Sequence, residues 1–445
     1  MKLIRDFMDK IEPDKEKSRF LHTLWDGMDT FLFAPDSTTK IGTHIKDGMD
    51  LKRTMVHVVI AMQLAFIAGM INIGHQHYVA LGMYPGLVDG LGFKLAYGFL
   101  QYLPPLIVVH VVGLGIEFFF AAKKGHAIEE GFLVSGFLIP LIMPPNVPLW
   151  ILALATAFAV IIAKEAFGGT GMNILNVALV ARVFVFFAYP ATISGDEVWV
   201  AFDYNLLHQL VGLKAHTVEY FATMGHDFSS FFNEAGKFIP NASPLIDGWT
   251  GATPMGLAAA GGWEEVQNAS YTIFNAQGDI VNTYQQYSVG NMIFGNIPGS
   301  VGEMNKLAIL VGVLILIGSG IGSWRIMLSL VLGAAFMSIV LNLITVVYPD
   351  FTNPFIAVPW YYQFIMGSLL FAMAFMATDP VTASSTNTGK WIYGFLIGVF
   401  GIIIRVTNPA YPEGWMLAIL LINVFAPLLD HMVIQSNIKR RLSRV

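Results

Sequence analysis

Apolar runs long enough to approach the width of a lipid bilayer alternate with polar connections along this chain. A hydrocarbon core of about 30 Å needs about 20 helical residues. Ten runs come near that length: 55–74, 95–121, 131–144, 148–164, 172–190, 306–322, 325–347, 356–377, 391–406 and 413–433. The pattern predicts an all-α polytopic membrane protein with about ten transmembrane helices.

A long polar stretch, residues 191–305, divides the ten runs into two groups of five. Because five is odd, two related halves would have opposite orientation, as in inverted repeats. The third run of each half ends in a proline-containing break, "IPLIMPPNVP" and "AFMATDPVTASS". Unrelated helices that merely break at proline are the alternative. Irregular backbone at membrane depth must be buried or line a cavity, so these breaks are candidate site walls.

The basic residues of the short connections set the expected orientation. The basic N-terminus, "AAKKGH", Lys164, Arg325, Lys390 and the tail "KRRLSR" fall on one side of a ten-span chain, which is therefore predicted to be cytoplasmic. Both termini are then cytoplasmic, and residues 191–305 form a folded extracytoplasmic loop. The predicted organisation is a cytoplasmic segment 1–54, a first transmembrane half 55–190, the loop 191–305, a second half 306–433 and a basic cytoplasmic tail 434–445.

Composition narrows the possible chemistry. Charged residues make up 12% of the chain, about half of the usual share in soluble domains. Cysteine is absent, so this chain supplies no thiolate for an iron–sulfur cluster or a structural disulfide. The net charge of −5 gives no sign of nucleic-acid binding. Any redox chemistry must use an organic cofactor or a partner subunit, and no dinucleotide-binding Gly-x-Gly-x-x-Gly precedes a helix.

The polar loop carries a short motif, "DGWTGAT" at residues 247–253. Its residue types favour a tight turn, and Pro254 biases Thr253 towards an extended backbone that presents its hydroxyl. An ordinary polar turn is the alternative, although a chance match is on the order of one in a thousand. The motif resembles the flavinylation signature of membrane redox pumps. The resemblance implies that a flavin transferase joins FMN through its phosphate to Thr253, and that Asp247, Thr250, Gly251 and Ala252 complete the motif.

Three further stretches extend this resemblance over nearly the whole chain: "KEAFGGTGMNILNVALVARVFVFFAYPATISGDEVW", "FMATDPVTASSTNTGKWIYGFLIG" and "FAPLLDHMVIQSNIKRR". They are similar to the family of B subunits of sodium-translocating NADH:quinone oxidoreductases. The D subunit of the Rnf electron-transport complex is the alternative, and a non-redox inverted-repeat channel or transporter is a rival from another class. The loop around 261–300 exceeds what the family needs, so no role is assigned to it.

The resemblance implies a multi-pass subunit of the bacterial inner membrane, within a sodium-pumping NADH:ubiquinone reductase. It implies a covalent FMN and a riboflavin that pass electrons towards ubiquinone while sodium is exported. NADH oxidation and cluster chemistry would belong to other subunits.

Charged residues inside membrane segments are costly and indicate function. Asp379 precedes a stretch rich in hydroxyls that could join it in binding sodium, or it could cap a helix end. Asp430 could be an entry carboxylate or a partner of the tail arginines. Phe371 and Phe375, one helical turn apart, could form a hydrophobic constriction on the sodium path, with a lipid-facing aromatic pair as the alternative.

Other positions carry competing interpretations. Gly168 and Gly169 could admit a flat quinone or allow close helix packing. Glu117 and Arg182 are expected to form an ion pair that holds helices together, and Arg405 is a further intramembrane charge. His75 and His77 resemble metal ligands only superficially, since no carboxylate or thiol accompanies them at zinc spacing.

Overall fold

The computed structural model describes residues 51–124, 131–196, 198–227, 245–275, 277–348, 353–408 and 414–444, with isolated positions 10–13, 22, 25, 39, 42–43 and 231. The predicted cytoplasmic segment 1–54 lies mainly outside these residues. Within the described residues the chain is mostly helical, and six helices are long and apolar enough to cross a membrane. The expectation of a polytopic all-α membrane protein is confirmed.

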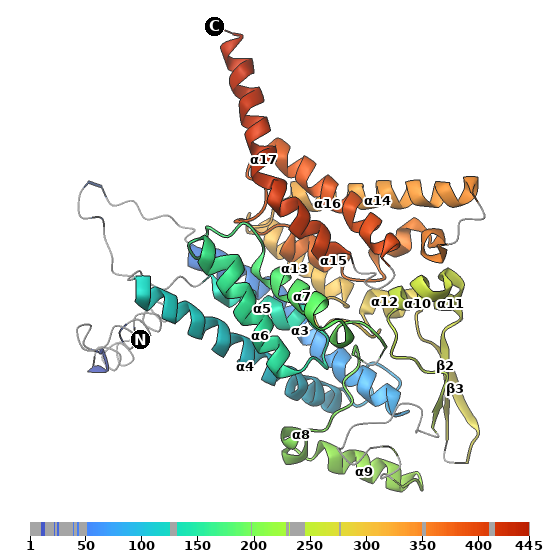
Figure 1. Ribbon diagram of the computed structural model, residues 1–445. Helices are drawn as coiled ribbons and strands as arrows, with labels where there is room; N and C mark the ends of the chain where they lie inside the picture. The colour runs from blue at the N-terminus through green and yellow to red at the C-terminus, as the bar shows by residue number, and fades with distance from the viewer. Residues whose placement is uncertain are drawn as a thin grey trace.

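The first half contains five helices (Figure 1): α3 (Leu51–Ala80), α4 (Leu91–Lys124), α5 (Phe132–Ile142), α6 (Leu149–Phe158) and α7 (Val177–Ala188). α6 continues as a π-helix, η1 (Ala159–Lys164), and a 3-10 turn, η2 (Glu165–Phe167). α5 is short because Pro144 and Pro145 follow it and cannot extend the hydrogen-bond ladder. The third segment of this half therefore ends at the predicted break.

The second half contains four regular helices: α13 (Lys306–Gly318), α14 (Trp324–Val347), α16 (Asn387–Thr407) and α17 (Trp415–Leu442). Between α14 and α16 the chain forms only short pieces: η5 (Pro354–Ala357), η6 (Trp360–Phe364), α15 (Leu369–Phe371) and the π-helix η7 (Ala372–Met376). The prediction of one span over 356–377 is wrong. Pro359 removes a backbone donor within it, and Gly367 disfavours helix immediately before α15.

One packing pattern recurs in the two halves. In the first half α4 packs on α6, α6 on α7, and α5 on α7. In the second half α14 packs on α16, α16 on α17, and η7 on α17. Contacts between α3 and α13 and between α7 and α17 join the halves. The recurrence supports two related five-element halves, with the broken η7 in the place that α5 holds in the first.

The long loop is a folded insertion, as predicted. After the 3-10 turn η3 (Pro190–Thr192) it contains α8 (Leu206–Leu210), α9 (Leu213–Thr223), β1 (Ile246–Asp247), α10 (Pro254–Gly261), α11 (Trp263–Asn268), β2 (Ser270–Phe274), β3 (Ile280–Gln285) and α12 (Val289–Phe294). The strands form one antiparallel sheet in the order β1-β2-β3. A separate apolar core, with Met255, Val266, Tyr287, Phe355 and Met366 among its members, anchors this insertion to the broken segment of the second half.

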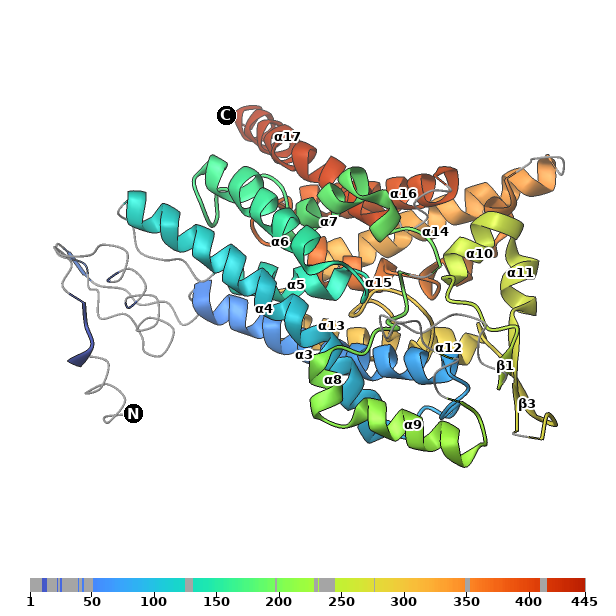
Figure 2. The same ribbon diagram turned by 60° about the horizontal axis from the view of Figure 1, so that its bottom comes forward.

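The insertion and the C-terminal end of α17 lie at opposite ends of the helical bundle. In Figure 2 the cluster of α10, α11 and the sheet lies at the right, whereas the end of α17 lies at the left. α13 begins directly after the insertion, so its C-terminal end also points away from it. The two ends of the bundle can therefore be told apart by their connections.

A topology test follows from this arrangement. A reporter that is active only outside the cytoplasm is expected to work when inserted at Gln277, an exposed residue in the turn between β2 and β3, and to fail when fused after Val445. Alkaline phosphatase activity in intact cells measures the outcome. The reverse pattern would contradict the predicted orientation, and a cytoplasm-active reporter at both positions serves as the reciprocal control.

Candidate functional site

The turn that carries the 247–253 motif needs glycine at two positions. Gly248 has a φ of +75°, and a Cβ there would lie 2.7 Å from the carbonyl oxygen of Ser270. A Cβ at Gly251 would lie 2.6 Å from the carbonyl oxygen of Asp196. The backbone of the motif is thus pressed between β2 and the chain that follows α7, and larger residues would displace it.

Two residues beyond β3 hold this turn. Gln286 Nε2 donates to the Thr250 carbonyl at 2.5 Å, and Gln286 Oε1 accepts from the Thr250 amide at 3.3 Å. The Tyr287 hydroxyl donates to the Ala252 carbonyl at 2.5 Å. Burial, followed by the charge of Asp196, raises the pKa of the Tyr287 phenol, so it stays protonated and remains a donor. No motif pointed to this pair, which lies in the stretch left without a role above.

Thr253 is the N-cap of α10. Its backbone is extended (φ −80°, ψ 154°), as Pro254 predicts, and its Oγ1 accepts the Gly256 amide at 3.1 Å. The side chain is 8% exposed. A phosphate ester on this oxygen would sit at the start of an eight-residue helix, where backbone amides and the helix dipole favour negative charge. The residues present therefore fit a phosphate-linked group. Asp247 lies on β1 opposite Thr272 with its side chain exposed.

A cavity with both polar and apolar lining residues, here called the inner cavity, opens at the end of the bundle opposite the insertion. Six residues that line it are Lys164, Thr170, Asn173, Asn176, Phe375 and Asp379. The first residues of α3 and the chain just after α13 complete its wall, which places it at that end. The turn after Gly169 and the carboxylate of Asp379, more than 200 residues apart in the sequence, therefore face one cavity.

Asp379 is held by a turn and by a partner from the other half. Its Oδ1 accepts the Val381 amide at 3.0 Å, and its Oδ2 accepts the Thr382 hydroxyl at 3.1 Å and Asn176 Nδ2 at 3.3 Å. Asn176 is itself the N-cap of α7. The carboxylate thus stabilises local backbone, as the capping interpretation expects, and it also borders the cavity, as a cation site requires. The sodium role of Asp379 remains a prediction.

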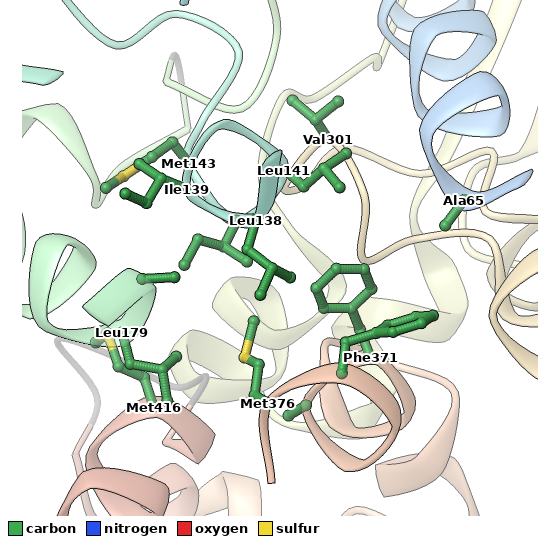
Figure 3. Close-up of a cluster of buried hydrophobic side chains, with 14 of the residues drawn as sticks. Ala65, Leu138, Ile139, Leu141, Met143, Leu179, Val301, Phe371, Met376 and Met416 are labelled. Atoms are coloured by element: carbon green, nitrogen blue, oxygen red, sulfur yellow. The ribbon is translucent and has the colours of Figure 1, made fainter. Parts of the chain in front are cut away.

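Phe371 and Phe375 are in contact and buried, with ring centroids 4.9 Å apart and exposures of 0% and 4%. The lipid-facing alternative is therefore wrong. The chain breaks before α15 and folds between the halves, which turns both rings inward. Figure 3 shows Phe371 and Met376 facing Leu138 and Leu141 of α5. We call the buried set around them the hydrophobic barrier: Leu138, Ile139, Leu141, Val301, Phe371 and Met376.

Asp430 on α17 binds the start of α16. Its Oδ1 accepts the hydroxyls of Ser384 and Thr386, each at 2.6 Å, and the Thr386 amide at 2.9 Å, while its Oδ2 accepts the Ser385 amide at 2.7 Å. The expected alternative of an ion pair with the tail arginines is wrong, because the helix carries those residues away from this loop. Its hydroxyl-rich surroundings suit a cation path.

The backbone conformation at positions 168 and 169 requires glycine. Their φ values are +121° and +106°, and the nearest atom to an added Cβ would be Met172 Cγ at 3.4 Å or Glu165 Oε1 at 4.0 Å. The alternative of close helix packing is therefore wrong. The two glycines reverse the chain after η2 and deliver Thr170 and Asn173 to the inner cavity. Quinone binding at this turn remains a prediction.

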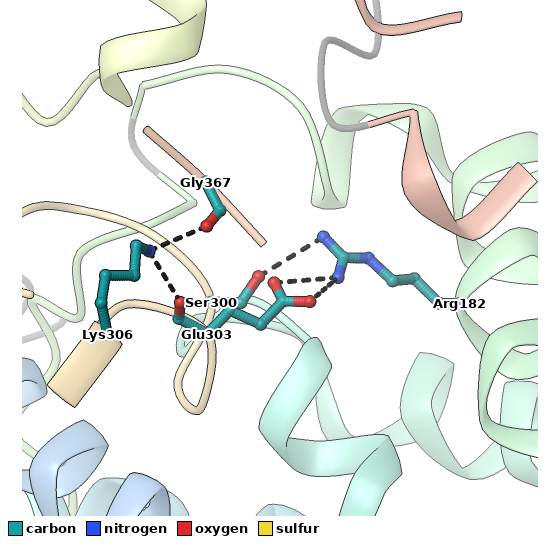
Figure 4. Close-up of polar contacts among 5 residues, drawn as sticks. All are labelled: Arg182, Ser300, Glu303, Lys306 and Gly367. Atoms are coloured by element: carbon teal, nitrogen blue, oxygen red, sulfur yellow. Dashed lines mark hydrogen bonds and ion pairs between the residues drawn. The ribbon is translucent and has the colours of Figure 1, made fainter. Parts of the chain in front are cut away.

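The expected ion pair between Glu117 and Arg182 is also wrong. Glu117 pairs with Lys164, because the π-helix at the end of α6 turns that lysine inward. Arg182 pairs with Glu303, whose two carboxylate oxygens each lie 3.1 Å from its Nη1 (Figure 4). Helix spacing could not have revealed Glu303, which lies in the chain just before α13.

The Arg182–Glu303 pair belongs to a buried network that joins the two halves (Figure 4). Arg182 Nη2 donates to Ser300 Oγ at 3.4 Å. Lys306 Nζ donates to the carbonyls of Glu303 at 3.0 Å and Gly367 at 2.8 Å. The network therefore ties α7, the start of α13 and the chain before α15 together beside the hydrophobic barrier.

Breaking this network on one side should destabilise the protein. Glu303→Leu leaves the Arg182 charge buried and is expected to cost about 3–5 kcal/mol, measured as a fall in the thermal unfolding temperature of the detergent-solubilised protein. The double variant Arg182→Leu with Glu303→Leu removes both charges and is expected to recover most of that loss. Equal destabilisation of the single and double variants would contradict a charge-pair origin.

The remaining singled-out residues hold structure. Arg405 Nη1 donates to the Gln363 carbonyl at 2.7 Å, and its guanidinium lies over the Trp415 ring. His77 contacts the Ala201 carbonyl at 2.8 Å, and His75 contacts Lys94 Nζ at 3.1 Å. These contacts join the helices to one another and to the insertion.

Comparison with known proteins shows the family to which this chain belongs. Residues 38–439 match the model of the NQR2, RnfD, RnfE family. The chain belongs to that family. It is 41% identical to the B subunit of the Na(+)-translocating NADH-quinone reductase of Ectopseudomonas mendocina (strain ymp) and to that of Stutzerimonas stutzeri (strain A1501), and 40% identical to that of Azotobacter vinelandii (strain DJ). Each alignment covers 99% of both chains. Within the family, the expected resemblance to the B subunits is confirmed.

Proposed function

We propose that this chain is the membrane subunit of a sodium-translocating NADH:quinone reductase that carries covalent FMN on Thr253 and a riboflavin, and that passes electrons to ubiquinone while sodium is exported. The observation that carries the flavin assignment is the turn at residues 247–253. Gln286 and Tyr287 hold this turn, and it places the Thr253 hydroxyl at the start of α10. Relatives named as the B subunit of this reductase, aligned over 99% of the chain, support the complex.

The flavin groups would supply the redox chemistry, since a cysteine-free chain supplies no cluster ligands. The protein's contribution at Thr253 is to hold the attachment point. Gln286 and Tyr287 fix the backbone carbonyls on either side of Gly251, and the amide end of α10 would face a phosphate joined to Thr253. Attachment itself would require a flavin transferase, with Asp247 as an exposed feature for that enzyme to recognise.

We propose that the ion path runs through the inner cavity and the hydrophobic barrier. Asp379 offers a charged oxygen at the cavity wall, and Asp430 offers a second carboxylate among hydroxyls at the same end of the bundle. Phe375 borders both the cavity and the ring of Phe371 within the barrier. A cation that enters the cavity would therefore meet oxygen ligands first and an apolar constriction next.

We propose that quinone binds at the turn formed by Gly168 and Gly169. Neither glycine carries a side chain of its own; Gly168 is exposed and Gly169 is buried behind it. A flat ring can approach such a surface closely. Because this turn also supplies Thr170 and Asn173 to the inner cavity, quinone reduction and sodium entry would occur on adjoining surfaces.

Two measurements, one on the denatured chain and one on inverted membrane vesicles, test this function. The denatured chain should fluoresce in a gel under ultraviolet light, since only a covalent flavin survives denaturation. Inverted membrane vesicles supplied with NADH should accumulate sodium in a protonophore-resistant manner. A non-fluorescent chain that still conducts sodium without NADH would support the rival channel or transporter.

A further inference from the structure

A second cavity, with a mainly polar lining and here called the outer cleft, lies at the opposite end of the bundle from the inner cavity. Six of its lining residues are Gln101, Pro105, Pro145, Asn146, Asp203 and Asn205. They come from the middle of α4, the irregular chain between α5 and α6, and the beginning of the insertion. The two insertion residues place the outer cleft on the insertion side.

The outer cleft gathers oxygen atoms that the fold leaves available. Pro105 lies inside α4 and has no amide hydrogen, so the carbonyl of Gln101, which lines the cleft, loses its helical donor. Gln101 uses its Nε2 to donate to the Pro145 carbonyl at 3.3 Å, which leaves its Oε1 to the cleft. These are neutral oxygen ligands of the kind that hard cations prefer.

Asp203 adds the charge. Its backbone carbonyl accepts the Tyr97 hydroxyl at 3.1 Å, but its carboxylate has no hydrogen-bond or ion-pair partner within the described part of the chain. A carboxylate beside amide and carbonyl oxygens, with no protein cation to neutralise it, attracts a cation from solution.

The outer cleft leads inward. A narrower cavity shares Gln101, Pro105 and Pro145 with it and reaches Ile73 and Val301. Val301 belongs to the hydrophobic barrier, where Figure 3 shows it beside Leu141. On the far side of the barrier, Leu138 lines the inner cavity. The outer cleft and the inner cavity thus lie on opposite sides of one apolar layer.

From this arrangement we infer that the outer cleft is a sodium site on the release side of the membrane, with Asp203 as its charged ligand and Gln101, Asn146 and Asn205 as neutral ones. The inference rests on the proposed function for the identity of the ion. The barrier separates this site from the inner cavity, so an ion that has crossed it binds at Asp203 before it leaves.

The absence of cysteine from the chain permits a direct test. In the assembled complex, a cysteine introduced by Leu149→Cys, at a lining position that is not a proposed ligand, reports access to the outer cleft when a charged thiosulfonate reagent is added from the insertion side. Sodium is expected to slow its labelling several-fold relative to potassium at equal ionic strength. Adding Asp203→Asn is expected to raise the sodium concentration needed for protection about tenfold or more. A cysteine from Gln277→Cys, on the exposed hairpin, is the control and should label independently of sodium.

Equal protection by sodium and potassium, or unchanged sodium protection with Asp203→Asn, would overturn the inference. NADH-driven sodium uptake by the complex that carries none of these substitutions is measured in the same preparation. If that uptake is absent, the proposed function fails, whereas the labelling result still reports whether the cleft binds sodium.

Discussion

The Thr253→Ala variant is expected to contain no covalent flavin while remaining inserted in the membrane and assembled. Alanine lacks the oxygen that a phosphoester requires. The loss of the Gly256 N-cap contact should cost only about 1 kcal/mol, which is small beside the burial of the membrane helices. In-gel fluorescence of the denatured chain, normalised to its protein content, measures the effect.

Two control variants separate the role of the Thr253 oxygen as attachment point from recognition of the motif by the modifying enzyme. Thr253→Ser keeps a hydroxyl at the N-cap and should retain part of the fluorescence. Asp247→Ala should reduce it, because the Asp247 side chain is exposed on β1 and is available to a modifying enzyme. Undiminished fluorescence in Thr253→Ala would show that the flavin is attached elsewhere.

The Asp379→Ala variant is expected to raise the sodium concentration for half-maximal quinone reduction by about tenfold or more, with normal flavin content. The carboxylate is the acidic group in the wall of the inner cavity, and alanine supplies neither charge nor oxygen. If ion movement is coupled to electron flow, turnover should fall most when sodium is scarce. Steady-state quinone reduction over a sodium titration gives this concentration.

Alanine also removes the two contacts that hold the local turn and the contact to Asn176, so a second variant isolates the charge. Asp379→Asn keeps an acceptor oxygen for the Val381 amide and an amide group that can donate to the Thr382 hydroxyl, and it should raise the sodium requirement in the same direction. Asp279→Asn, on the exposed hairpin of the insertion, should leave it unchanged. A normal sodium requirement in both Asp379 variants would reduce this residue to a helix-end cap.

The sequence by itself determined the membrane class, the division at residues 191–305 and the position of most helices. Each of these depends on local properties: apolar runs of sufficient length, proline breaks, and the residue types of a tight turn. The extended backbone at Thr253 is of the same kind, since Pro254 restricts its neighbour without help from the rest of the fold.

The tertiary structure alone decided which charges meet and which breaks share a cavity. Arg182 pairs with Glu303 instead of Glu117, and Asp379 reaches Asn176 across 203 residues. The aromatic pair Phe371 and Phe375 turned inward because the segment around it does not form a continuous helix. Such contacts depend on how the two halves are placed against each other, and buried charges accept whichever partner that placement brings within hydrogen-bonding distance. Spacing along a single helix carries no information about that partner.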